Sequence, residues 1–303
     1  MHAALVGKNV IEKLCRIPTE VDIASEFRYR NPIIDDKTLC IFVSQSGETA
    51  DTIAALKLSK QKKAKTLAIS NVIGSSMTRE ADYSIYTHAG PEIAVASTKA
   101  YTSQIVLMNI LAIYFAEILE TADKETLNNF KKDILALPKQ IEETLKSDDI
   151  VKEFAKKIYQ EKDVYYLGRG VDETVAREGS LKLKEISYIH SESYAAGELK
   201  HGTIALIENG VTTISILTDE KLMNKTISNI QEVITRGAKT LIVTNLDLDK
   251  TMFDIVIDIP KTNCFISPIL SVVPLQLLAY HVSKEKGLDV DKPRNLAKSV
   301  TVE

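Results

Sequence analysis

Short runs of apolar, often β-branched residues alternate along the chain with longer stretches of helical character. This alternation is typical of a parallel sheet covered by helices, because parallel neighbours are joined by crossover helices. Strands are expected at 39–43, 65–70 and 83–87 in the first part of the chain and at 164–167, 212–217, 240–244 and 254–259 in the second. The pattern predicts an α/β fold of doubly wound parallel sheets, with functional loops at the carboxyl ends of the strands.

The same pattern occurs twice along the chain. Residues 64–71 (AKTLAISN) reappear 174 positions later at 238–245 (AKTLIVTN), and this offset, applied without a gap, lays 41–43 on 215–217. A repeat of this length indicates two tandem copies of one α/β unit. We expect the break between them near 137–149, around Pro138. The predicted organisation is a first domain, a second domain and an extended C-terminal tail, at 1–140, 150–290 and 291–303.

The two copies differ at their beginnings. The second copy has a strand and the turn Gly168-Arg169-Gly170 before its first helix. At an offset of 174, Met1 corresponds to Val175, which lies inside that helix. We therefore expect the chain to begin within a helix whose preceding strand is absent.

Composition excludes several classes of function. Lys plus Arg total 38 and Asp plus Glu 41 in 303 residues, a net charge of -3, so no bulk positive field attracts nucleic acid or an anionic membrane. Cys15, Cys40 and Cys264 lie far apart and in no metal-ligand spacing, which favours buried thiols in a reducing cytoplasm and makes a disulfide framework unlikely. Neither a metal nor a cofactor is expected. The apolar run 105–119 is shorter than the roughly 20 residues of a bilayer helix and is expected to be buried.

The loop after the first predicted strand reads SQSGET and precedes a helix-forming segment. A strand, small hydroxyl residues, a glycine and a helix start supply what an anion site needs: free backbone N–H groups, hydroxyl donors and the positive end of the helix dipole. The alternative is an ordinary strand-to-helix turn with Ser46 as N-cap. The matching loop of the second copy lacks the glycine and carries two acids, Asp219 and Glu220. Because acids repel phosphate, this asymmetry favours a single ligand site in the first copy.

Three further segments carry candidate chemistry. Glu178, Lys182 and Glu185 share one helical stripe, either as an ion-paired surface or as a carboxylate proton carrier beside a lysine. His201, between small residues and glycines, is expected on an accessible, flexible segment, where it is either inert or a proton donor. The C-terminal tail is either frayed or docked as an extended strand that brings Lys298 to a site.

Five motifs together closely resemble the glutamine–fructose-6-phosphate aminotransferase (isomerising) family, the glucosamine-6-phosphate synthases. The motifs are SQSGET at 44–49, EIAVASTK at 92–99, LKLKEISYIH at 181–190, GELKHG at 197–202 and PRNLAKSVTVE at 293–303. The resemblance spans essentially the whole chain and is to the isomerase half of that family, which consists of two sugar-isomerase (SIS) domains.

The resemblance implies a role for each motif. The sugar phosphate would contact Ser44, Gln45, Ser46 and Thr49, and the site would be lined by Val95, Ala96 and Ser97. Glu185 would move a proton between C1 and C2, beside Lys182 and Glu178, and Lys298 would form a Schiff base with the ketose. His201 would assist ring opening from the other subunit of a homodimer. Fructose 6-phosphate and glucosamine 6-phosphate are the implied ligands.

The sequence also departs from that family. The glutaminase domain that supplies ammonia is absent, and so is the first SIS strand with its Cys-Gly-Thr-Ser turn; Thr203 stands where proline is usual. The primary hypothesis is a cytoplasmic isomerase half that binds fructose 6-phosphate and isomerises it. The alternatives are an amino-sugar-phosphate deaminase or deglycase of the SIS family, and a catalytically dead sugar-phosphate-binding module.

Overall fold

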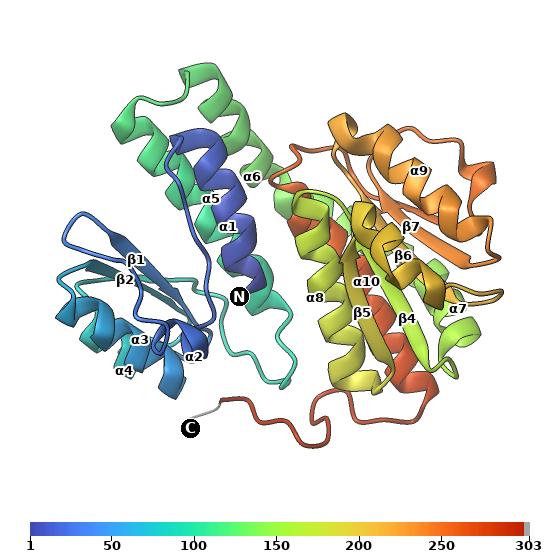
Figure 1. Ribbon diagram of the computed structural model, residues 1–303, viewed down its shortest axis with the longest axis horizontal. Helices are drawn as coiled ribbons and strands as arrows, with labels where there is room; N and C mark the ends of the chain where they lie inside the picture. Colours follow the sequence, from blue (N-terminus) through green and yellow to red (C-terminus); the bar gives the residue numbers. More distant parts are fainter. Residues whose placement is uncertain (300–303) are drawn as a thin grey trace.

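The computed structural model describes residues 1–299 and has two parallel sheets side by side, with helices between and around them (Figure 1). The first sheet has the order β1-β2-β3, with strands Leu39–Val43, Lys65–Ser70 and Tyr83–Tyr86. The second has the order β5-β4-β6-β7-β8, with β4 Asp163–Gly168, β5 His190–Ala195, β6 Thr212–Leu217, β7 Lys239–Thr244 and β8 Ile255–Asp258. The predicted α/β class is confirmed.

The helices of the first half are α1 His2–Cys15, α2 Ala24–Phe27, α3 Ala50–Gln61, α4 Ser76–Glu80 and α5 Lys99–Leu119. A helical run leads into the second half through α6 Lys124–Thr144, η1 Leu145–Ser147 and α7 Asp148–Ile158. The remaining helices are α8 Val171–Ser187, η2 Ala196–His201, η3 Thr203–Leu206, η4 Glu220–Leu222, α9 Met223–Ile234, η5 Lys250–Met252 and α10 Ser267–Glu285.

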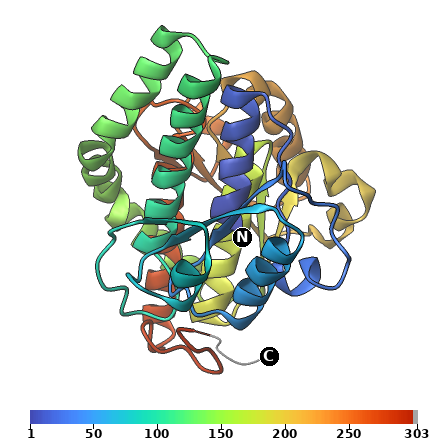
Figure 2. The ribbon, with the colours of Figure 1, turned by 90° about the vertical axis from the view of Figure 1, so that its left-hand side faces the viewer.

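The main apolar core lies between the two sheets, where α1 and α5 of the first half meet α8 and α10 of the second. Seen from the side of the first half, the small sheet lies in front of α1 and α5 (Figure 2). Each half brings its two core helices together at a glycine. A Cβ at Gly7 would collide with Met108 of α5, and a Cβ at Gly179 would collide with Leu275 of α10. The repeat is therefore visible in the packing as well as in the sequence.

The structure corrects the gapless offset of the repeat. Ile41 and Ile214 both pack into the main core, and they pair with Leu67 and Leu241 of the next strand. Strands β1 and β6 are therefore related by 173 residues, whereas β2 and β7 are related by 174. A slip of one residue would turn every side chain of the strand to the opposite face, so the one-residue insertion falls after α3 and α9, outside the strands.

Pro138, near which the break between the halves is expected, lies on the exposed side of α6, inside the helical run that connects the two halves. Strand β5 was not predicted, because its sequence HSESYA has no apolar alternation. It is an edge strand that pairs only with β4. Only Ser191 in it is buried, so neither face of the strand requires a row of apolar side chains.

Helix α5 is longer than the apolar run suggested. At 21 residues it is long and apolar enough to cross a membrane by length and composition alone, a test that core helices of soluble proteins also pass. One face packs in the core through residues such as Ile105 and Met108. The opposite face leaves Ile110, Tyr114 and Ile118 exposed. The expectation of a buried helix thus holds for one face.

Candidate functional site

The predicted phosphate loop connects β1 to α3 and is shaped by its own hydroxyl groups. The Gly47 amide donates to Ser44 Oγ at 3.0 Å, and the Glu48 amide donates to Ser46 Oγ at 3.2 Å. The N-cap of α3 is Thr49, and its side chain makes no capping hydrogen bond. The alternative with Ser46 as a plain N-cap is therefore wrong. An uncapped helix start keeps backbone N–H groups available to an anion.

Gly47 is required by the shape of this loop. Its φ of +68° lies in the left-handed region, and a Cβ there would collide with the side chain of Ser75. The Gly47 carbonyl accepts from the Met77 amide at 3.0 Å, and the Gln45 carbonyl accepts from the Asn71 amide at 3.1 Å. The loop is thus held against the carboxyl end of β2 and the start of α4 by backbone hydrogen bonds.

A second loop, which contains Val95, Ala96 and Ser97, leads into α5. The Glu92 carboxylate accepts hydrogen bonds from the Thr98 amide and hydroxyl and, at 2.6 Å, from the Ala100 amide. Glu92 therefore caps α5 and folds the 92–98 segment back on itself. Ala96 is buried, while Val95 and Ser97 are half-buried.

The stripe on α8 is a chain of ion pairs that continues into the first half. Lys182 Nζ lies 3.3 Å from Glu178 Oε1 and 2.7 Å from Glu185 Oε2. His2 Nδ1 of α1 lies 2.7 Å from Glu178 Oε2. The stripe faces α1 across the boundary between the halves, so the alternative of a solvated helix surface is wrong.

Burial and charge oppose each other in this chain of ion pairs. Burial would raise the pKa of the Glu178 carboxyl, but the hydrogen bond with His2 and the charge of Lys182 hold that pKa below its usual value. Burial would lower the pKa of Lys182, but the carboxylates of Glu178 and Glu185 raise it. Both groups therefore stay charged near neutral pH. The side chain of Glu185 is 22% exposed against 5% for the other two, so Glu185 is the member that a substrate can reach.

His2 is a residue of the site that the sequence reasoning missed. Nothing near it in the sequence marks it as a candidate. Its partner Glu178 lies 176 positions away, and only the packing of α1 against α8 joins them.

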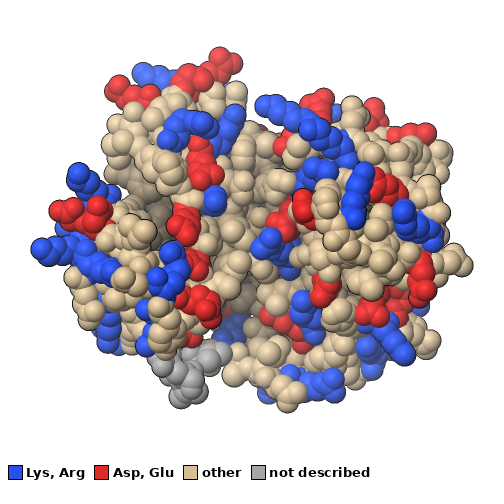
Figure 3. Space-filling model, in the orientation of Figure 1, with Lys and Arg blue, Asp and Glu red and all other residues tan. Residues whose placement is uncertain are grey.

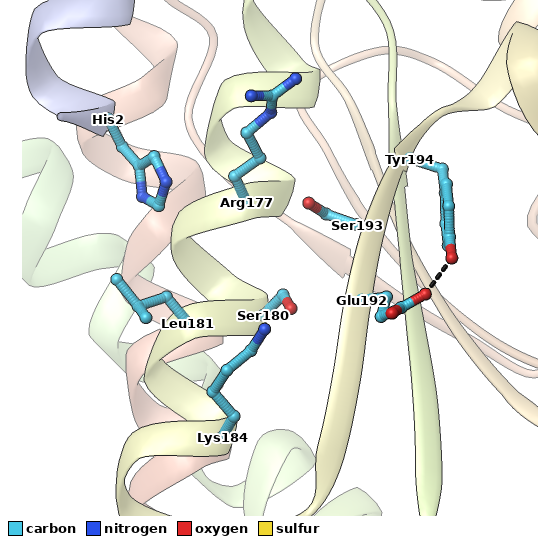
Figure 4. Close-up of a pocket in the computed structure, with 8 residues that line it drawn as sticks. All are labelled: His2, Arg177, Ser180, Leu181, Lys184, Glu192, Ser193 and Tyr194. Atoms are coloured by element: carbon cyan, nitrogen blue, oxygen red, sulfur yellow. Dashed lines mark hydrogen bonds between the residues drawn. The ribbon is translucent and has the colours of Figure 1, made fainter. Parts of the chain in front are cut away.

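The ring of His2 also borders a polar groove of about 400 Å³ between α8 and β5, shown in Figure 4. The groove is lined by His2, Arg177, Ser180, Leu181, Lys184, Glu192, Ser193 and Tyr194. None of the predicted site residues lines it, but His2, the partner of Glu178, does, so the groove borders one end of the chain of ion pairs.

The C-terminal tail is docked over the first half, which is the second of the two alternatives for this segment. Ser299 Oγ lies 3.1 Å from Ser46 Oγ of the phosphate loop. The Lys298 ammonium donates to the Ala94 carbonyl at 2.5 Å, and the Asp291 carbonyl accepts from the Val95 amide at 3.0 Å. Val300 and Val302, on which the docking prediction also rested, lie outside the described residues.

The charge of Lys298 is influenced by groups from both halves of the molecule, Glu92 in the first half and Lys182 and Glu185 on α8. Burial lowers the pKa of its ammonium below the usual value; Glu92 opposes this effect, and the ammonium of Lys182 reinforces it. The carboxylate of Glu185 on α8 also opposes the effect of burial, because its negative charge raises the pKa of Lys298. A lysine whose pKa is lowered in this way is more often neutral, which is the form that attacks a carbonyl.

His201 is the one predicted catalytic residue that the fold does not bring to the others. It is exposed at the end of η2, a 3-10 helix and not a loop without regular structure. The η2 helix packs against α9, where Lys200 Nζ lies 2.8 Å from Glu232. Leu199 joins an apolar cluster with Tyr165, on the face of the second sheet opposite α8. The sheet therefore separates His201 from Glu185 within one chain.

The surface carries no strong field of one sign on the face shown in Figure 3, where basic and acidic side chains are interspersed. Within residues 1–299, no group of three or more His, Cys, Asp or Glu side chains could hold a metal ion. An anionic ligand would thus be held by local N–H, hydroxyl and lysine donors.

Comparison with known proteins agrees with this geometry. The SIS domain family model matches residues 1–114 and 157–284. The chain is 61% identical, over its whole length, to a glutamine--fructose-6-phosphate aminotransferase [isomerizing] of Clostridium tetani, and covers 50% of that protein. It is 37% identical to the C-terminal domain of glucosamine-fructose-6-phosphate aminotransferase from Francisella tularensis, with a TM-score of 0.92, covering 96% of this chain and 84% of that one.

A glucosamine-6-phosphate deaminase from Thermotoga maritima shares the fold, with a TM-score of 0.81 at 24% identity, covering 99% of this chain and 86% of that one. The chain spans about half the length of the curated relatives that it matches. It belongs to the SIS domain family, and within that family it matches the C-terminal isomerase half of the glutamine–fructose-6-phosphate aminotransferases.

Proposed function

We propose that this chain binds fructose 6-phosphate and carries out the sugar-phosphate isomerase step of glucosamine 6-phosphate synthesis. The observation that supports this proposal is a convergence of three parts. The tail contacts the phosphate loop through Ser299 and Ser46, and Lys298 interacts electrostatically with Glu185 and Lys182 of α8. The tail thus connects the predicted anion site of the first half with the half-buried carboxylate of Glu185, through a lysine whose pKa is lowered.

The phosphate group occupies the N-terminal end of α3, where the hydroxyls of Ser44, Ser46 and Thr49 and the amide of Gln45 are available. Val95, Ala96 and Ser97 line the sugar. The Lys298 amine attacks the C2 carbonyl of the open-chain ketose, and loss of water gives an imine. Ammonia then replaces the lysine nitrogen at C2 by imine exchange, which releases the Lys298 amine. Glu185 removes a proton from C1 to give an enolamine and returns a proton to C2, which leaves an amino group at C2 and an aldehyde at C1.

Glu178 and Lys182 hold Glu185 in place and keep its surroundings charged. The Glu178–Lys182 pair is nearly completely buried, so breaking it would leave an unpaired charge in the core. Its role in the proposal is electrostatic, because neither group is accessible enough to exchange protons with a sugar.

His201 enters the proposal through a second copy of the chain. Within one chain it lies across the second sheet from Glu185, and it is exposed on the surface. We therefore propose a homodimer in which the η2 segment of each subunit reaches the site of the other, where His201 assists ring opening. Ammonia would come from a glutaminase domain elsewhere in the full-length protein, as the name of the relatives indicates, and the protein would act in the cytoplasm.

The test is exchange of carbon-bound hydrogen with solvent. In D₂O the chain is expected to introduce deuterium at C1 of recovered fructose 6-phosphate, measured by NMR. Glu185→Gln keeps the shape but removes the base, so the exchange rate is expected to fall by roughly two to four powers of ten, with ligand affinity retained. Glu142→Gln, at an exposed position in α6, is the matched control and is expected to exchange at the normal rate.

Three outcomes would change the proposal. Exchange at the normal rate in Glu185→Gln would place the base elsewhere. Binding of fructose 6-phosphate without any exchange would support a catalytically dead binding module. Release of ammonia from glucosamine 6-phosphate faster than its synthesis from ammonia would favour the deaminase alternative.

A further inference from the structure

The C-terminal tail is attached to the end of α8 by a single tyrosine. The Arg294 amide donates to Tyr188 Oη at 2.8 Å, and the Arg294 guanidinium lies 4.2 Å from the centroid of the Tyr188 ring. One side chain thus binds the backbone of the tail through its hydroxyl and a side chain of the tail through its ring. A guanidinium at this distance from an aromatic face is attracted by the ring electrons.

The remaining hydrogen bonds of the tail beyond Pro293 go to the first half. Lys298 donates to the Ala94 carbonyl, and Ser299 contacts Ser46. In the described residues 294–299 of the tail, the hydrogen bond from Arg294 to Tyr188 is therefore the one that connects the tail to the second half. The ring also holds Arg294 near the ammonium of Lys286, whose pKa is lowered by burial and by the charge of Arg294. The attraction between the Tyr188 ring and the Arg294 guanidinium opposes the repulsion between the positive charges of Arg294 and Lys286.

The internal repeat shows that the fold does not itself require a tyrosine here. Tyr188 is the C-cap of α8, with a φ of 61°, and its counterpart 172 residues earlier is Arg16, the C-cap of α1, with a φ of 56°. Both positions end the helix in the left-handed conformation. Arg16 only donates back to the Glu12 carbonyl of its own helix, at 3.4 Å. The backbone conformation is common to both halves, whereas the contact with the tail belongs to Tyr188 alone.

The position of Tyr188 relates two functional groups. It lies three residues after Glu185 on α8, and its partner Arg294 lies four residues before Lys298 in the tail. We propose that Tyr188 and Arg294 form a latch that positions Lys298 relative to Glu185, so that the amine of the tail and the carboxylate of the helix face the same substrate. This inference rests on the proposed function of Lys298 and Glu185 but assigns a role to two other residues.

The test compares variants of the latch in the full chain. Fructose 6-phosphate and borohydride are added, and the rate at which an adduct forms on Lys298 is measured by mass spectrometry, together with the affinity for fructose 6-phosphate. Tyr188→Leu and Arg294→Ala are each expected to lower the trapping rate about tenfold, because a hydrogen bond or a ring contact is lost, with little change in affinity. Tyr188→Phe keeps the ring and is expected to recover most of the rate.

Arg16→Ala is the matched control, since it changes the equivalent cap of the first half, and it is expected to trap at the normal rate. Arg294→Ala lies in the exposed tail, so its result does not depend on the stability of the core. Normal trapping rates in both Tyr188→Leu and Arg294→Ala would overturn the latch. Equal losses of trapping in Tyr188→Leu and Arg16→Ala would also overturn it, since they would indicate a general effect of the helix caps.

A second measurement separates the latch from the proposed function. In the ligand-free chain, acetic anhydride labels lysines according to their accessibility and amine character. Tyr188→Leu is expected to change the labelling of Lys298 several-fold relative to that of Lys124, a lysine outside the tail, whereas Arg16→Ala is not. If the wild-type chain forms no borohydride adduct, the imine of the proposed function fails. Unchanged Lys298 labelling would instead refute the latch.

Discussion

The phosphate loop at 44–49 and its counterpart at 217–222 occupy equivalent places in the two halves, yet their polar groups are used differently. The two loops follow the equivalent strands β1 and β6 and lead into the equivalent helices α3 and α9. In the second half the Asp172 carboxylate accepts the Thr218 amide at 2.7 Å and the Thr218 hydroxyl at 2.6 Å. In residues 1–299, no carboxylate accepts a hydrogen bond from the phosphate-loop residues Ser44, Gln45, Ser46 and Thr49.

The comparison teaches how one fold produces one site from two copies. The second copy satisfies its loop with an internal carboxylate from the first turn of α8. In the first copy, the polar groups of the loop contact the loop's own hydroxyls and Ser299 and, in our proposal, an external anion. The internal carboxylate carries an energetic cost, since burial raises the pKa of Asp172 to about 6. A second phosphate would meet Asp172 and Asp219, and like charges would repel it.

The largest effect is expected from placing a carboxylate in the first loop. Ser46→Asp should weaken fructose 6-phosphate binding by roughly a hundredfold or more, because the new charge faces the phosphate at the start of α3. Isothermal titration calorimetry would measure this loss. The corrected offset pairs Ser46 with Asp219, which is already an acid, so Asp219→Ser is the control and should leave the affinity unchanged. Equal losses at both positions would show that the two loops are not functionally different.

The next effect concerns the internal carboxylate and the pH. The pKa of Asp172 is raised to about 6 from 3.8, so its protonated form stabilises the fold below pH 4 and this stability is lost as the pH rises through 6. Asp172→Asn should therefore gain stability relative to the wild type by about 3 kcal/mol between pH 4 and pH 7. Urea unfolding at a series of pH values would measure the difference. A difference independent of pH would mean that Asp172 does not titrate in the folded chain.

The smallest effect concerns the shape of the loop. Gly47→Ala should lower the free energy of unfolding by about 2 to 3 kcal/mol, because the left-handed backbone is strained and the new Cβ meets Ser75. Gly74→Ala has a similar positive φ but no atom within 4 Å of the new Cβ, so it should cost only about 1 kcal/mol. Thermal unfolding of both variants would give the comparison. Equal costs would show that the backbone strain, and not the contact with Ser75, sets the effect.

The two halves also show what local sequence specifies. Strands β1, β2 and β6 begin and end at the predicted residues, because each is a short apolar run between turn residues. The docking of the tail was one of two alternatives that the sequence left open. Strand β5 was not predicted, because its sequence HSESYA has no apolar alternation and only Ser191 in it is buried.

By itself, then, the sequence determined the α/β class, the repeat, the hydroxyl-rich loop and the stripe Glu178, Lys182 and Glu185. Each of these follows from the pattern of residues within single helices, strands and loops. Only the tertiary structure decided the offset of 173 in the first strands, the pairing of His2 with Glu178, the contact of Lys298 with Ala94 and the separation of His201 from Glu185. These depend on which faces of distant elements are buried together. Side-chain packing between helices sets that choice, and no local pattern of residues encodes it.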